Sequence, residues 1–411
     1  MPILLPEDLA LELPRFNPVR QIFADDHLGD VAGAVREQMT RPEIRARITP
    51  GAKTAVAVGS RGISNLSLIV KTVIDQLKQA GAEPFIVPAM GSHGCGTAEG
   101  QRELLAGYGI DEESMGAPVA SDVSVTELGL LQDGTPVCFD RTALAADLVI
   151  PINRIKLHTD FVADIQSGLI KMLVIGLGNH QGCSTMHEAG FDRFGERLIE
   201  AAGLIMARAQ VGFGLGLVEN AYDRTLLVEA IPAEKLVARE KELVRVARER
   251  MARLMIPEID VLVVQEIGKD ISGNGYDPNI LGRSFLLKEF VLPVPRIGRM
   301  VLTGLSAPTH GNASGLGSFD VITRAVFDQL NLEDTYANCV AVNSLSDAKI
   351  PLIASTEEEA LRVAVKSLPQ ADKRNLKIVR IKNTLELEWI EVSDALLPQV
   401  AANPALALKA E

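Results

Sequence analysis

The chain has 411 residues, 47% of them apolar and 23% charged, so it has a globular composition and enough length for two domains. A formal net charge of −12 and scattered basic residues argue against a nucleic-acid surface. No apolar run approaches the roughly 20 residues that cross a bilayer, and Pro6, Glu7 and Asp8 interrupt any signal-peptide pattern. The cysteines are far apart, which argues against a disulfide framework. We therefore expect a cytoplasmic protein without nucleic-acid or membrane partners.

The first half of the chain alternates strand and helix patterns. Residues 53–60 (KTAVAVGS) and 83–90 (EPFIVPAM) are typical of buried strands, and residues 66–79 have the apolar spacing of a helix. A glycine-rich loop at 91–96 and a helix that begins near Thr97 follow. This order predicts a parallel sheet, in which ligands bind at the carboxyl ends of the strands.

The remaining pattern predicts two α/β domains with mostly parallel sheets flanked by helices and an active site in the cleft between them. The expected elements are a hairpin at 132–135, strands at 147–153, 211–217, 225–230, 260–267, 299–304, 377–381 and 386–392, and helices at 191–207, 233–251, 319–330 and 357–368. The long charged helix at 233–251 suggests a division into domains of residues 1–255 and 256–411. The last helix has the option of packing back on the N-terminal domain.

Two histidines follow predicted strands. His93 lies in GSHGCG, where the glycines leave room for a ligand. His158 lies in NRIKLHTD, where Arg154 and Lys156 favour an anionic ligand and a neutral imidazole. Two imidazoles at strand ends suit an acid–base pair that reaches one carbon from both faces, as a racemase requires. The alternative for His158 is a surface position beside two solvated cations.

Lys171 and two later histidines are further candidates. Lys171 lies in an apolar stretch, where its ammonium must be paired, deprotonated as a nucleophile, or extended to the surface. His180 and His187 are seven residues apart and are candidate metal ligands on one helix. His27 and His310 are interpreted as structural or surface residues.

The order and context of these residues resemble the nickel-dependent lactate racemase family. Residues 89–97 (AMGSHGCGT) are similar to the ATGxHRPxT segment of that enzyme. His158, the Ser167-Gly-x-x-Lys171 run and His187 are similar to its second histidine, its SGGRK lysine and its metal-binding histidine. The resemblance covers most of residues 50–190, with a weaker echo at 260–285.

The resemblance implies a nickel-pincer nucleotide, the pyridinium-3,5-bisthiocarboxylic acid mononucleotide that grips nickel through two sulfur atoms and C4. Its partners would be the enzymes that synthesise this cofactor. Lys171 would hold the cofactor, covalently or not, with Ser167, Gly168 and Arg61 nearby. His187 would supply the fourth ligand of a square-planar nickel centre.

The same resemblance implies an isomerase that inverts the C2 carbinol of a 2-hydroxy acid. His93 and His158 would take turns as base and acid on the hydroxyl while hydride leaves carbon for the cofactor. The N-terminal domain would carry this machinery, and the C-terminal domain would complete the substrate pocket.

The chain departs from the family in the region of the substrate. The loop at 59–64 has Arg61 two positions from the family's arginine, and the family's glutamine and lysine are missing after residues 275–280. A longer or polar 2-hydroxy acid, such as an aldonic acid, is therefore as reasonable a substrate as lactate. Arg283 or Lys269 is expected to bind its carboxylate.

Two other functions remain open from the sequence. One is a zinc or other divalent-metal hydrolase that uses His180, His187 and a carboxylate such as Glu188. The other is a non-catalytic α/β protein that binds nucleotides or sugar acids. Nickel content and racemisation distinguish these alternatives from the pincer enzyme.

Overall fold

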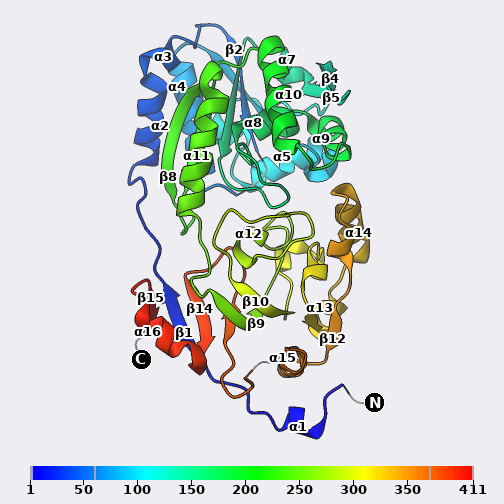
Figure 1. The fold of residues 1–411 in the computed structure, drawn as a ribbon. Coiled ribbons are helices and arrows are strands. Elements are labelled where there is room, and N and C mark those ends of the chain that lie inside the picture. Colours follow the sequence, from blue (N-terminus) through cyan, green and yellow to red (C-terminus); the bar gives the residue numbers. More distant parts are fainter. Residues whose placement is uncertain (1–2, 60–61, 370–371, 410–411) are drawn as a thin grey trace. The chain divides into compact units, whose positions relative to one another are not determined.

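A computed structural model describes residues 3–59, 62–369 and 372–409 and divides them into compact α/β units (Figure 1). One unit comprises Asp25–Met251, and the other joins Met1–Ala24 to Ala252–Glu411. Each unit has a largely parallel sheet with helices against it, so the predicted fold class is confirmed. Over the described ranges, the helices are too short or too polar to span a membrane.

The sheet of the Asp25–Met251 unit has the strand order β3-β2-β6-β7-β8. These strands are β2 (Lys53–Val58), β3 (Glu83–Pro88), β6 (Leu148–Arg154), β7 (Phe213–Glu219) and β8 (Thr225–Pro232). All neighbours pair in parallel except β7 and β8. The loops that follow β2, β3 and β6 therefore leave the same edge of the sheet, as the sequence predicts.

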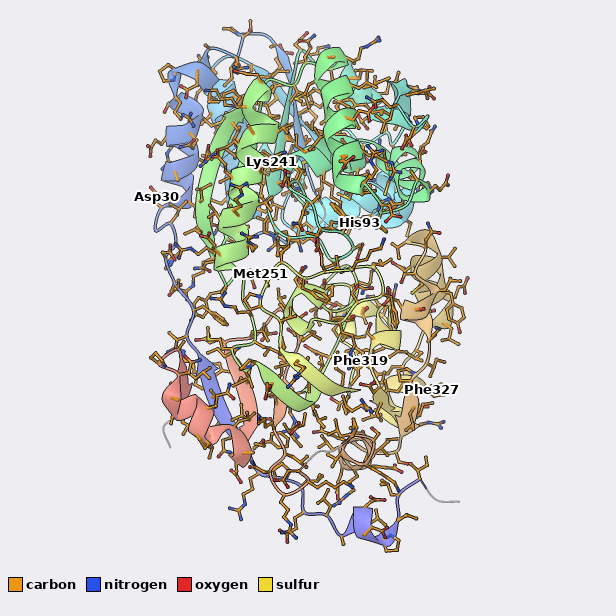
Figure 2. All side chains as sticks on the ribbon, in the orientation of Figure 1. Asp30, His93, Lys241, Met251, Phe319 and Phe327 are labelled. Atoms are coloured by element: carbon orange, nitrogen blue, oxygen red, sulfur yellow. The ribbon has the colours of Figure 1, made fainter. Side chains whose placement is uncertain are left out.

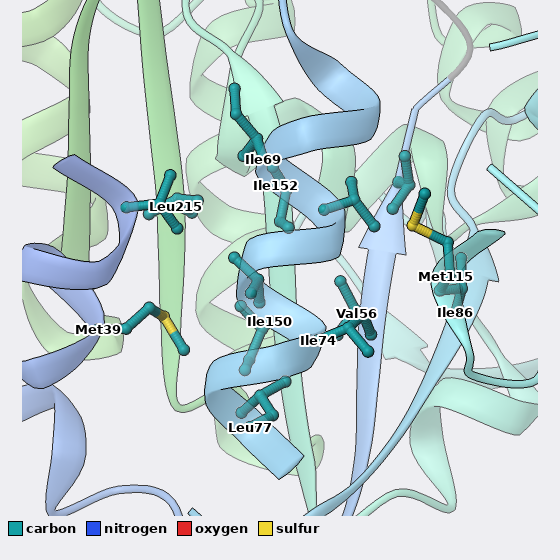
Figure 3. Packing of buried hydrophobic residues seen from close by; sticks show 14 of the residues in the cluster. Met39, Val56, Ile69, Ile74, Leu77, Ile86, Met115, Ile150, Ile152 and Leu215 are labelled. Carbon is teal, nitrogen blue, oxygen red and sulfur yellow. The ribbon is translucent and has the colours of Figure 1, made fainter. Parts of the chain in front are cut away.

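One face of this sheet is covered by α2 (Val31–Thr40) and α4 (Leu66–Gln79). The bounds of α4 match the helix predicted at residues 66–79. The apolar side chains of α4 recur at helical spacing and are buried against the strands. Figure 3 shows Ile74 of this helix beside Val56 of β2 and Ile150 of β6. Each fully buried isoleucine or valine of this kind contributes ~1.5–3 kcal/mol to folding.

The other helices of this unit include a nearly continuous helical segment from residue 169 to residue 188. It consists of α8 (Leu169–Lys171), a π-helical turn (Met172–Gly176) and α9 (Asn179–Glu188). Against α8 pack α10 (Phe194–Arg208) and α11 (Leu236–Arg250). The shorter helices are α3 (Pro42–Arg45), α5 (Ala98–Gly107), α6 (Glu112–Met115) and α7 (Arg141–Leu144), and a separate hairpin is formed by β4 (Val125–Leu130) and β5 (Pro136–Asp140).

Two glycines of β7 leave room for neighbouring side chains, and one of these side chains belongs to α8. A Cβ at Gly214 would lie 2.8 Å from Leu169 Cδ1, and one at Gly216 would lie 2.9 Å from Ile155 Cδ1. Both distances are too short for a side chain in a packed interior. The absence of a side chain at Gly214 therefore lets the segment carrying Lys171 rest closely on the sheet.

The second unit contains a mixed sheet with the strand order β12-β11-β10-β9-β13-β14-β1-β15. Its strands are β1 (Phe16–Gln21), β9 (Glu258–Val264), β10 (Arg296–Leu302), β11 (Val321–Thr323), β12 (Leu352–Ala354), β13 (Ile378–Ile381), β14 (Trp389–Ser393) and β15 (Leu406–Leu408). Its helices are α1 (Pro6–Leu9), α12 (Pro278–Leu281), α13 (Arg324–Asp328), α14 (Leu332–Ala341), α15 (Glu357–Lys366) and α16 (Leu397–Ala402). The strands from β12 to β13 are parallel, and the remaining pairs are antiparallel.

The structure differs from the sequence prediction in three places. The predicted domain of residues 1–255 included the N-terminus, but β1 pairs with β14 and β15 and so belongs to the other unit. The predicted helix at 319–330 is instead a short strand, β11, followed by α13. The last helix, α16, packs on β15 of its own unit. The first two differences depend on strand pairing between residues far apart in sequence, which local periodicity does not contain.

Candidate functional site

The loop that carries His93 follows β3 and lies against α9 (Figure 2). A Cβ at Gly91 would lie 3.3 Å from Cys183 Sγ, and one at Gly96 would lie 3.2 Å from His180 Cβ. Both glycines have φ values in the left-handed region, +60° and +64°, which favours glycine. The glycines on either side of His93 thus allow its loop to pack closely on α9, the helix that carries His180 and His187. The His93 side chain itself is exposed.

His158 follows β6 and is held by the turn that it begins. Its backbone N–H donates to Gln166 Oε1 at 2.8 Å, and its Nδ1 accepts the backbone N–H of Asp160 at 3.1 Å. The carboxylate of Asp160 lies 3.9 Å from the same nitrogen. A neutral ring in this position therefore carries its proton on Nε2.

The neighbouring cation Arg154 is not a solvated surface residue. Its guanidinium pairs with Glu219, and the two side chains are only 17% and 4% exposed. Glu219 also accepts the backbone N–H of Ser64 at 2.6 Å. Arg154 and Glu219 therefore hold the backbone at Ser64, shortly before α4.

A cluster of phenylalanine rings joins His158 to His187. The His158 ring lies 4.4 Å from Phe161, centroid to centroid, and Phe161 lies 4.9 Å from Phe194. His187 lies 5.4 Å from Phe194 and 5.6 Å from Phe191. Aromatic rings at these separations are in direct contact. Two histidines that are 29 residues apart in sequence therefore line one aromatic cluster.

His187 and Cys183 are adjacent on one face of α9. The Nδ1–H of His187 donates to the Cys183 carbonyl at 2.6 Å, and the same nitrogen lies 3.5 Å from Cys183 Sγ. Burial raises the pKa of the thiol, but the imidazole, Ser92 and the charge of Lys171 bring it below its ordinary value. Burial lowers the pKa of His187, but its contacts with Cys183 raise it above its ordinary value. Because Nδ1 is a donor to the carbonyl, Nε2 is the nitrogen able to bind a metal.

The turn that leads to Lys171 is held from three sides. Ser167 forms a two-way backbone bridge with Lys156, at 2.8 and 3.1 Å. The side chain of Asn153 donates to the Gly168 carbonyl at 2.9 Å. From α11, Glu240 accepts the backbone N–H of Ile170 at 3.0 Å. The half-buried Lys171 therefore leaves a turn whose backbone is fixed, and its charge acts on both Cys183 and His187.

Sequence reasoning missed several residues of this site. Glu240 lies in a charged run that resembles a solvent face, although it is four residues after Leu236 and three before Leu243, on the apolar stripe of its helix. The phenylalanines contain no catalytic group, so no motif identifies them. Cys183 lacked the paired spacing of a metal-binding cysteine.

The other predicted residues belong to the second unit, to the residues outside the description, or to the exposed side of α9. Lys269 and Arg283 belong to the second unit, where the ammonium of Lys269 donates to the Gly273 carbonyl at 2.6 Å and Arg283 pairs with Asp320 at 2.7 Å. Arg61 lies outside the described residues. His180 is exposed on α9, seven residues before His187 as predicted for one helix.

No metal-ligating cluster of three or more His, Cys, Asp or Glu side chains is found among the residues that the structure describes. A surface cavity of about 610 Å³ is lined by Ile63, Leu66, Lys71 and Tyr108 and contains none of the candidate side chains. A protein-only metal centre on His180, His187 and Glu188 therefore gains no support.

Comparison with known proteins finds similarity to lactate racemase. Residues 11–197 match the model of the lactate racemase N-terminal domain. No curated protein matches the chain by sequence. Its fold is similar to that of the lactate racemase apoprotein from Thermoanaerobacterium thermosaccharolyticum, with a TM-score of 0.55 and 14% identity over 90% of this chain and 99% of that one. The first part of the chain is thus similar to a lactate racemase N-terminal domain, and the chain has an α/β fold similar to that of the racemase apoprotein.

Proposed function

We propose that the protein is a racemase or epimerase that inverts the C2 carbinol of a 2-hydroxy acid and uses a nickel-pincer nucleotide. One observation carries the proposal, the proximity of the candidate side chains within one unit. His158 and His187 contact the same phenylalanine cluster, and the charge of Lys171 acts on His187. The His93 loop packs on α9, the helix that carries His187. Residues dispersed over 95 positions of sequence thus share neighbours within one unit, which supports the proposal.

The residues present fit the implied cofactor. His187 has the arrangement common to metal-binding histidines, in which one ring nitrogen donates to a carbonyl and the other is left for the metal. A centre whose other donors come from the cofactor needs only one protein ligand, which agrees with the lack of a larger ligand cluster in the described ranges. Lys171, on its fixed turn, would hold the nucleotide beside it. When bound, this cofactor supplies a hydride acceptor.

The acid–base work falls to His93 and His158. Asp160 engages Nδ1 of His158, so Nε2 is the nitrogen that would meet the substrate hydroxyl. With Nδ1 accepting the Asp160 N–H, the ring presents a proton donor. With the proton on Nδ1, the hydrogen bond from the Asp160 N–H would be given up, the Asp160 carboxylate at 3.9 Å would stabilise that proton, and Nε2 would become an acceptor. Asp160 thus supports both the acid and the base form of His158. His93 would act as the base when His158 acts as the acid, and as the acid when His158 acts as the base.

The phenylalanine cluster would exclude water from this chemistry. Phe161 and Phe194 are buried and contact the two histidine rings. An apolar wall beside the reacting carbon strengthens the hydrogen bonds that the imidazoles make there. For the substrate carboxylate, Lys269 and Arg283 remain the proposed partners.

The test is coexpression with the pincer-cofactor biosynthetic enzymes, followed by nickel analysis and a screen of chiral 2-hydroxy acids for inversion. We expect bound nickel, and inversion that falls ~10²–10⁴-fold in His93→Ala and in His158→Ala. Lys171→Ala should lose the cofactor mass, and the surface control His310→Ala should behave as wild type. Inversion that survives in the His93→Ala/His158→Ala double variant would refute the assigned roles, and zinc with hydrolase activity would refute the reaction.

A further inference from the structure

Glu240 is a buried carboxyl group that the proposed chemistry does not use. It lies on α11 between the buried residues Leu236 and Leu243 and is 0% exposed. Its Oε2 accepts the backbone N–H of Ile170 at 3.0 Å, and the N–H of Leu169 also points to the carboxylate. Its Oε1 has no hydrogen-bond partner among the described residues. Buried polar atoms are rarely left in this state, so the residue requires an explanation.

Stability alone does not explain a glutamate at this position. Burial raises the pKa of Glu240 to about 7, although the amides of Ile170 and Leu169 act in the opposite direction. An apolar side chain of similar size would avoid this desolvation. The charged residues on either side of Glu240 in the sequence have partners of their own, because Arg239 pairs with Glu229 and Lys241 pairs with Asp164.

The carboxyl group instead completes the turn before Lys171. Gly168 occupies the N-cap position of α8 and provides no side-chain cap. A Cβ at Gly168 would lie 2.5 Å from Glu240 Oε1, so glycine is required for the carboxylate to reach the amides. On the other side of the turn, Asn153 holds the Gly168 carbonyl. The cap that helices normally take from their own sequence is thus supplied by another helix.

We propose that Glu240 is a positioning residue that sets the direction of Lys171 by holding the two backbone amides that precede it. The inference rests on the proposed role of Lys171 in binding the cofactor. The glutamate touches neither the substrate nor the lysine ammonium in this role. It acts through the backbone of Leu169 and Ile170, and its removal should disturb Lys171 without loosening the sheet.

Hydrogen exchange of the cofactor-free full-length chain tests this role. Glu240→Leu removes the acceptor, Glu240→Gln keeps it without the charge, and Glu242→Leu is the matched control on the exposed side of α11. In the leucine variant, the amides of Leu169 and Ile170 should exchange roughly ten- to hundredfold faster, as for a lost hydrogen bond to a carboxylate. The glutamine variant and the control should stay close to wild type.

The second readout is acetylation of Lys171 relative to the exposed Lys53, measured by peptide mass on the same samples. We expect the ratio to change in Glu240→Leu and to be rescued in Glu240→Gln. Unchanged exchange at Leu169 and Ile170, or faster exchange spread equally over β2 and β6, would overturn the positioning role. Because both measurements use cofactor-free protein, a wild type without racemase activity would contradict the proposed function and leave this result standing.

Discussion

The free energy of unfolding should depend on pH through Glu240, and Glu240→Gln should remove that dependence. The pKa of this carboxyl is raised from 4.5 to about 7 by burial. The folded state therefore keeps the proton over a range in which the unfolded chain has lost it, so stability falls as the pH rises from about 4.5 to about 7. At ~1.36 kcal/mol per pKa unit, the loss is about 3 kcal/mol, and it is complete above the folded pKa.

The assay is urea denaturation at several pH values between about 5 and 8, with unfolding monitored by circular dichroism. Trp389, the single tryptophan, lies in the other unit, so its fluorescence separates the two transitions. His187 contributes with the same sign, because its raised pKa stabilises the fold at low pH and this contribution is lost as the pH rises. The difference between wild type and Glu240→Gln cancels that contribution. A difference that is constant over the whole range would refute the reasoning.

Three further outcomes follow from the site. His187→Ala should abolish nickel retention by the loaded protein, as measured by metal analysis, because His187 is the proposed protein ligand. Substitution of the exposed His180 by alanine should leave the nickel bound. Equal loss in both variants would contradict the assignment of the ligand. Gly214→Val should destabilise the Asp25–Met251 unit by ~1–3 kcal/mol in the same urea assay, because its side chain overlaps α8; a neutral substitution would show that α8 can move. Alkylation of Cys183 by iodoacetamide at neutral pH should slow in His187→Ala, which removes the group that lowers the pKa of the thiol; an unchanged rate would show that the pair is not coupled.

Local sequence determined the elements of the first unit. The apolar spacing of residues 66–79 and the strand runs at 53–60 and 83–90 reappear as α4, β2 and β3. Thr97 accepts the backbone N–H of Gly100 and caps α5, as its position before the helix predicts. The order of strand and loop also placed His93 and His158 at strand ends. These features depend on neighbours within a few residues, which is why they can be read without the fold.

Pairing over long distances decided the rest. The sequence has no local sign that β1 inserts between β14 and β15, or that Glu240, on the apolar stripe of its helix, meets the backbone amide of Ile170. The contact of His158 and His187 with one phenylalanine cluster arises only when β6, α9 and α10 pack together. Periodicity specifies which face of an element is buried, but the partner of that face is chosen by the global minimum of packing and hydrogen bonding. The types of residue in this site were therefore encoded locally, and their convergence was determined by tertiary structure.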